Sequence, residues 1–171
     1  PPVLASVAVT PDPAIVARGL TLQLSATGIL TDSSTRDRTA SATWSSSNVA
    51  AATIDASGLA SAIAQGTTTI SAMVEGITGL TVLTVTPPEL ASVAVTPDPG
   101  FVAKGLALQF SVTGTFTDDS TGDVSTLATW SSSNLGVASV ELPGLAVGVE
   151  LGTTIISALV EGLSGSSTLT V

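Results

Sequence analysis

The chain has 171 residues, of which 44% are hydrophobic and only 10% charged, and its formal net charge is −9 at pH 7. Four basic residues cannot form the basic footprint that nucleic-acid binding needs, and no apolar run approaches the ~20 residues of a membrane-spanning helix. The sequence contains neither Cys nor His, which excludes a disulfide-bonded scaffold and removes the commonest catalytic base.

The chain is two copies of one unit. Trp44 and Trp130, its only tryptophans, are 86 positions apart, and each lies in the segment Thr-Trp-Ser-Ser-Ser-Asn. When the sequence is aligned with itself at this offset, roughly 50 of 85 positions are identical and no gap is needed. We therefore predict two domains, residues 1–86 and 87–171, joined end to end by a short, semi-rigid linker that contains two prolines.

The first part of each unit predicts two strands. In residues 4–10, large apolar residues alternate with small or polar ones, as in a half-buried strand with Val7 and Val9 inward. Pro11-Asp12-Pro13 ends this strand because proline cannot donate to a ladder, and residues 15–17 predict a short edge segment. The clearest strand is residues 20–27, whose inward side is predicted to be Leu20, Leu22, Leu24 and Ala26.

The rest of the unit predicts shorter strands separated by turns. Residues 28–42 are polar and predict a hairpin tip, because Asp, Ser and Gly favour turns. The strand that carries Trp44 follows. Further strands are predicted at residues 52–54, 59–63, 67–74 and 80–85, which the sequence separates by turns containing glycine.

These patterns predict an all-β fold of two tandem immunoglobulin-like β-sandwiches, each with about seven strands. No segment has the period of an amphipathic helix, and short strands at intervals of about 8–12 residues are typical of Greek-key sandwiches. The usual disulfide between the sheets is absent. We expect Trp44 and Trp130 to be buried as the structural core of each unit.

Six segments of the first unit, taken in order, resemble the bacterial immunoglobulin-like domain, group 2. They are residues 6–11, 19–20, 43–48, 58–59, 66–70 and 83–85. The resemblance covers both units. It implies an invasin/intimin-like sandwich, found in tandem in bacterial surface proteins, adhesins and phage virion proteins, with no shared catalytic residues. The second unit departs from the pattern at Glu141-Leu142-Pro143-Gly144, where Pro143 replaces the usual small polar residue.

Catalysis finds little support in the residues. The many serines have no histidine beside them, and Lys104 is the only lysine. Two carboxylates of a hairpin tip, such as Asp32 with Asp37 or Asp118 with Asp123, could approach each other as a glycosidase pair, but we interpret them as residues of a solvated tip. We therefore expect a protein that is not an enzyme.

Calcium is the one cofactor that the acidic residues suggest. Asp118, Asp119 and Asp123 offer three carboxylates within six positions, although their spacing matches no known calcium loop. Glu89 and Asp98, near the junction of the two units, are a second candidate metal site.

Two functions remain open. The first is a non-catalytic spacer repeat of a larger extracellular surface, fibre or filament protein, whose partners are neighbouring Ig-like repeats of the same or an identical chain. The second is an adhesion module for a host protein or glycan, which includes a phage virion domain. Either function places the chain outside the cell, on a bacterial surface, in a secreted fibre or on a virion, with no insertion into the membrane.

Overall fold

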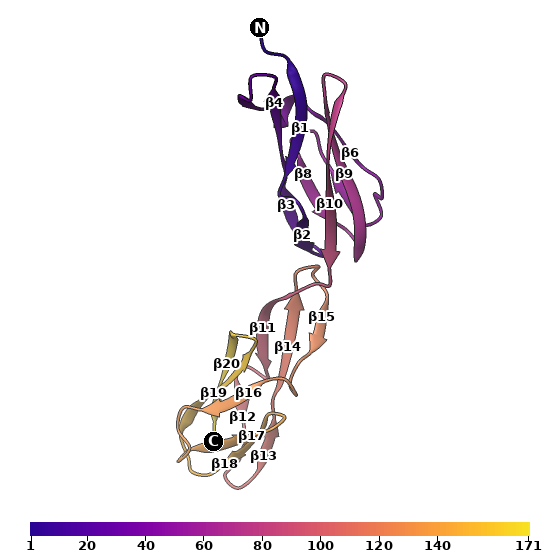
Figure 1. Cartoon of the computed structure of the whole chain (residues 1–171). Coiled ribbons are helices and arrows are strands. Elements are labelled where there is room, and N and C mark those ends of the chain that lie inside the picture. Colours follow the sequence, from indigo (N-terminus) through magenta and orange to yellow (C-terminus); the bar gives the residue numbers. More distant parts are fainter. The chain divides into compact units, whose positions relative to one another are not determined.

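The computed structural model describes residues 1–171, which form two compact units: unit 1, Pro1–Glu89, and unit 2, Leu90–Val171. Each unit is an all-β immunoglobulin-like sandwich with ten strands in the same order (Figure 1). Unit 1 also contains one turn of 3₁₀ helix, η1 (Thr39–Ser41), between its fifth and sixth strands.

The strands of unit 1 are β1 (Leu4–Thr10), β2 (Ala14–Ala17), β3 (Thr21–Gln23), β4 (Ser25–Leu30), β5 (Thr35–Asp37), β6 (Thr43–Ser46), β7 (Ala52–Ile54), β8 (Leu59–Ala62), β9 (Gly66–Val74) and β10 (Ile77–Thr86). Those of unit 2 are β11 (Leu90–Thr96), β12 (Gly100–Phe101), β13 (Ala107–Gln109), β14 (Ser111–Phe116), β15 (Thr121–Asp123), β16 (Thr129–Ser132), β17 (Ala138–Glu141), β18 (Leu145–Gly148), β19 (Thr153–Val160) and β20 (Leu163–Thr170).

The strands of unit 1 pair into a four-stranded sheet and two three-stranded ones. The four-stranded sheet has the order β2-β10-β9-β6, with β2 parallel to β10 and the other pairs antiparallel. The other two have the orders β1-β4-β5 and β3-β8-β7. Unit 2 repeats this arrangement strand for strand, so its four-stranded sheet is β12-β20-β19-β16.

The clearest strand of the sequence is two strands in the structure. Residues 20–27 are interrupted at Leu24, so that β3 pairs with β8 while β4 pairs with β1 and β5. At the break, the Leu24 N–H donates to Gly58 O (2.8 Å), and the Gln23 side chain donates to the carbonyls of Leu24 and Ser57 (2.8 Å each). The Gln23 amide thus satisfies a carbonyl that has left the ladder. Leu20, predicted inward, is instead 42% exposed, and it lies in the turn before β3, where its N–H donates to Ala17 O (3.1 Å).

The core of each unit lies between the four-stranded sheet and the two three-stranded sheets. In unit 1 the predicted inward residues Val7, Val9, Leu24, Ile70 and Leu83 are all buried in one cluster. In unit 2 the largest fully buried side chain is Phe110, which occupies the position of Leu24. Each sandwich therefore has a complete core of its own.

The tryptophans lie at the margin of these cores. Trp44 and Trp130 are only partly buried, and each packs against the core cluster of its own unit. We expected both to be buried, and the structure leaves each of them partly exposed. The indole Nε1–H needs an acceptor, and it finds one in a loop carbonyl, Thr39 O for Trp44 (3.0 Å) and Ser125 O for Trp130 (3.1 Å). The indole thus packs its apolar ring against the core and keeps its N–H at the polar edge of the sandwich.

Candidate functional site

The repeated Thr-Trp-Ser-Ser-Ser-Asn segment forms a hydroxyl network that joins β6 to β9. Thr68, which is buried, shares hydrogen bonds with Ser46 Oγ (2.8 Å) and Ser47 Oγ (3.3 Å), and accepts one from the Asn48 N–H (2.9 Å). Ser47 Oγ also accepts from the Thr69 N–H (2.9 Å). The equivalent atoms of unit 2 make the same bonds around Thr154. These serines thus hold two strands together, and their hydroxyls are already occupied.

Aspartates of the turns are occupied in a similar way. Asp32, Asp55, Asp118 and Asp123 are each followed two residues later by Ser, whose N–H and hydroxyl both donate to one carboxylate oxygen. Asp37 accepts from the Thr39 N–H in the same pattern. These are Asx turns, in which the side chain completes the backbone.

These bonds change the acidity of four of the aspartates. The pKa values of Asp32, Asp37, Asp55 and Asp123 are lowered, first by a hydrogen bond from the Ser or Thr side chain two residues along, and then by backbone N–H groups. Both donors favour the charged carboxylate. The spacing Asp-x-Ser/Thr is visible in the sequence and could have identified these residues as turn formers.

A dependence of stability on pH follows from the lowered pKa values. A carboxyl whose pKa is lower in the folded than in the unfolded chain stabilises the fold above the unfolded pKa, about 3.9 for Asp, and this contribution is lost as the pH falls through the folded value. We expect the urea midpoint of unfolding to be flat between pH 7 and 5 and to fall below about pH 4. Asp55→Asn should make this fall shallower, and an identical fall in that variant would contradict the assignment.

The candidate calcium ligands do not converge. No group of three or more Asp and Glu side chains is placed to hold a metal ion. In unit 2, Asp118 and Asp123 each belong to an Asx turn, and Asp119 lies between them at the hairpin tip with a positive φ of 63°. Glu89 and Asp98 belong to different units, and the Asp98 carboxylate accepts a bond from the Thr168 N–H (3.4 Å).

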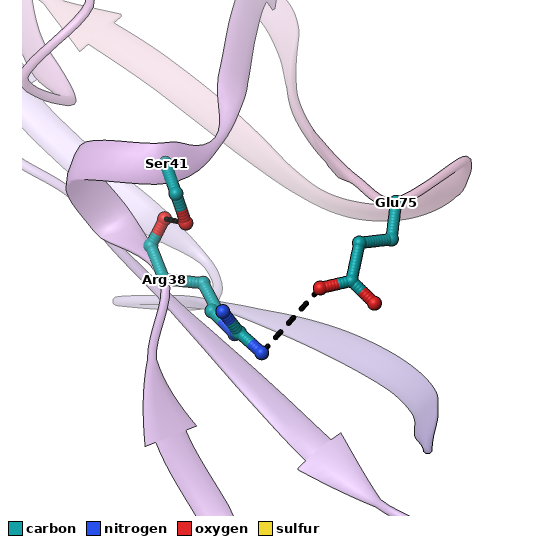
Figure 2. Close-up of polar contacts among 3 residues, drawn as sticks. All are labelled: Arg38, Ser41 and Glu75. Carbon is teal, nitrogen blue, oxygen red and sulfur yellow. Dashed lines mark hydrogen bonds and ion pairs between the residues drawn. The ribbon is translucent and has the colours of Figure 1, made fainter.

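Arg38 is the one partly buried cation of unit 1. It precedes η1, its Nη2 lies 3.5 Å from Glu75 Oε1 in the β9–β10 turn, and its carbonyl accepts from Ser41 Oγ (3.1 Å) (Figure 2). Its Nε is buried without a partner. Its stem packs over Gly28, where a Cβ would lie 3.0 Å from Arg38 Cγ. In unit 2 the same position is Val124, a buried residue that packs over Gly114.

Arg38→Val should therefore raise the free energy of unfolding of unit 1 by about 1 kcal/mol, because it removes a buried unpaired donor. Val fits this backbone, since Arg38 N and Val124 N donate to the equivalent carbonyls of Ala26 and Val112. Urea unfolding of a Trp130→Phe chain, with Trp44 as the sole fluorophore, would measure it. Glu75→Gln is the control and should change stability by less than about 0.5 kcal/mol, as an exposed ion pair does. A loss in Arg38→Val alone would contradict the expectation.

The outer face of each four-stranded sheet carries no charged residue. Most of the 17 charged residues lie in loops and turns, and the four within strands belong to β5, β15 and β17. We call the outward positions of the four-stranded sheets the uncharged faces. In unit 1 these positions are Ile15, Thr43, Ser45, Thr67, Thr69, Ser71, Met73, Thr78, Leu80, Val82 and Thr84.

The uncharged face is kept in unit 2 although several residues differ. The cross-strand pair Thr69 and Val82 becomes Ile155 and Thr168, so the hydroxyl and the aliphatic side chain exchange strands. Ile15, 62% exposed, becomes Phe101, 67% exposed. The face is thus a mixture of hydroxyls and aliphatic groups without charge. Alternation in the sequence shows which residues face outward but not which strands are neighbours, so this face could not be identified from the sequence.

A family model described as bacterial Ig-like domain (group 2) matches the chain twice, at residues 3–85 and 89–171. Among curated proteins, the chain is similar to ice-binding protein 1 of Shewanella frigidimarina, with 42% identity over 168 residues. That match covers 98% of this chain and 19% of the relative, so the chain spans about a fifth of that protein's length.

The chain is also similar to parts of several solved structures, at TM-scores below 0.5. The S-layer protein rSbsC(31-844) gives a TM-score of 0.47 at 18% identity, over 99% of this chain and 28% of that one. Extracellular domains 3–5 of Drosophila OTK give 0.49 at 8% identity, over 98% and 61%. A C-terminal fragment of intimin in complex with the intimin-binding domain of its receptor gives 0.41 at 15% identity, over 98% and 64%. The structure has no helix that could cross a bilayer.

Proposed function

The chain belongs to the bacterial Ig-like domain family (group 2), and from this premise we propose that its two units are a non-catalytic spacer within a larger protein presented outside the cell. The observation that carries the proposal is the duplication. Each unit has its own core and its own copy of the Thr68 or Thr154 hydroxyl network. What the two units share is the framework of the fold, which is all that a spacer needs.

Replacement within the parent protein tests this proposal. Residues 1–171 would be deleted, or exchanged for two unrelated Ig-like sandwiches of similar size. We expect the exchange to preserve the parent's attachment to its target and the deletion to weaken it, because a spacer acts through length. If the exchange weakens attachment as much as the deletion, the units themselves bind the target, and the spacer proposal fails.

An adhesive role is the second candidate, and the uncharged faces favour it. The similar Shewanella protein is an ice-binding protein, and the hydroxyl-bearing strands of this chain raise the question of whether it also binds ice. We propose that these faces do not bind ice. Their hydroxyls are interrupted by Leu80, Val82 and Met73 in unit 1. In unit 2 the first two positions are Ser166 and Thr168 and a new interruption stands at Ile155, so no regular array repeats along the chain. Ice-affinity partitioning of the 171-residue chain should leave it in the liquid, and its enrichment in ice would overturn this proposal.

A further inference from the structure

Unit 2 contains a pocket bordered by a turn whose residues differ from those of the equivalent turn in unit 1. The pocket, about 380 Å³ in volume, opens beside the partly buried indole of Trp130 and is lined by Ala128, Thr129, Trp130, Val140, Glu141 and Leu142. Its residues come from the start of β16 and the residue before it, from the end of β17 and from the turn that follows β17. This volume is within the range of small-ligand sites.

The acidic residue at the rim of the pocket has an unpaired carboxylate in unit 2, whereas the carboxylate of its counterpart in unit 1 is hydrogen-bonded. Asp55 accepts three hydrogen bonds within its own turn, from the Ser57 N–H, the Ser57 hydroxyl and the Leu59 N–H. The corresponding residues of unit 2 are Glu141 and Pro143, and proline has neither the N–H nor the hydroxyl. The carboxylate of Glu141 is exposed and has no hydrogen-bond or ion-pair partner.

The same difference in sequence between the two turns also gives the pocket an apolar wall. Leu142 replaces Ala56 and is 67% exposed beside the pocket. The hydrogen bond that closes the turn is retained, since Gly144 N donates to Glu141 O (2.6 Å) as Gly58 N donates to Asp55 O (3.1 Å). The substitutions therefore change the side chains that the turn displays and keep this closing bond.

We propose that this Trp130 pocket binds a basic side chain, lysine or arginine, of a partner protein. Val140 and Leu142 would contact the aliphatic stem, the indole would attract the cation through its π face, and the unpaired Glu141 carboxylate would receive the charged head. The charge of the unit is complementary, because unit 2 has seven acidic residues and one basic residue, Lys104, which is paired with Glu150. This site goes beyond the spacer role and does not depend on it.

Nuclear magnetic resonance of the whole chain tests the proposal, with unit 1 as the internal control. The probes are the peptides Ac-Gly-Lys-Gly-NH₂ and Ac-Gly-Arg-Gly-NH₂, and the neutral isostere is Ac-Gly-norleucine-Gly-NH₂. We expect the basic peptides to shift the Trp130 indole N–H and the amides of residues 128–130 and 140–142, with about three- to fivefold tighter binding than norleucine. The Trp44 indole should not move. Equal shifts with norleucine, equal shifts at Trp44, or no shift at all would each overturn the proposal.

Variants based on the other unit separate binding from folding. Glu141→Gln should reduce the affinity for the lysine peptide to the affinity for the norleucine peptide. The triple change Glu141→Asp, Leu142→Ala and Pro143→Ser gives unit 2 the turn of unit 1, which folds in this chain, and should abolish the shifts while the remaining spectrum stays native. The reverse change in unit 1, Asp55→Glu, Ala56→Leu and Ser57→Pro, should make the Trp44 indole respond. Retained binding in the triple variant would place the site elsewhere.

Discussion

Gly144→Ala is expected to lower the free energy of unfolding of unit 2 by about 3 kcal/mol or more. Gly144 has φ +100°, and a Cβ there would lie 2.5 Å from Phe110 O and 2.6 Å from Trp130 Cζ2. The backbone cannot retreat easily, because Gly144 O accepts from the Phe110 N–H (2.9 Å) at the break between β13 and β14. Strain and overlap therefore act together at one position.

Gly162→Ala is the matched control in the same unit. Gly162 has φ +86°, but nothing lies within 4 Å of its Cβ position, so this variant measures the cost of the left-handed backbone alone, about 1 kcal/mol. Urea unfolding in a Trp44→Phe background, followed through Trp130, gives both values. Equal losses in the two variants would mean that the contact with Trp130 and Phe110 contributes nothing.

The control in unit 1 is Gly58→Ala, with φ +81°. Its Cβ would lie 2.6 Å from Leu24 O but 3.0 Å from Trp44 Cζ2, so the overlap with the ring is smaller. We expect a loss between those of the other two variants. Losses of stability that increase in the order Gly162→Ala, Gly58→Ala, Gly144→Ala would indicate that the close approach of this turn to the tryptophan fixes the indole at the edge of the core.

Alternation along the sequence predicts the inward side of a strand well where the whole strand faces a single core. The inward positions of β1, β9 and β10 are buried as expected, because every second residue meets the same core. The interruption at Leu24 escapes such reasoning, since Leu22, Leu24 and Ala26 continue the alternation through it. It depends on Gly58 O, 34 positions away from Leu24, and on the Gln23 side chain. Only the assembled fold brings these groups together.

The candidate sites show the same limit. Carboxylates that are close in sequence, such as Asp118 and Asp123, bond to serines of their own turns, and the Asp-x-Ser spacing signals this locally. The departure at Pro143 is also visible in the sequence. The sequence does not show that Glu141 borders a pocket, because Trp130 from another strand is needed to complete that pocket.

The core of unit 2 contains an aromatic ring where the core of unit 1 contains a leucine, and a smaller neighbouring residue makes room for the ring. Leu24 becomes Phe110, fully buried, and Ala14, also fully buried, becomes Gly100. A Cβ on Gly100 would lie 2.7 Å from Phe110 Cζ and 3.0 Å from Leu108 Cδ2. The two exchanges therefore conserve the volume of the core between units.

This compensation predicts a strong coupling between the two positions. Gly100→Ala alone should destabilise unit 2 by about 1–3 kcal/mol through overpacking, and Phe110→Leu alone by about 1 kcal/mol through the space it leaves. The double variant restores the pair found in unit 1 and should be more stable than Gly100→Ala, with a coupling energy of about 1–2 kcal/mol. The cycle is measured by urea unfolding in the Trp44→Phe background. Additive losses would show that neighbours other than residue 100 make room for the ring, and that the two cores are packed by different means.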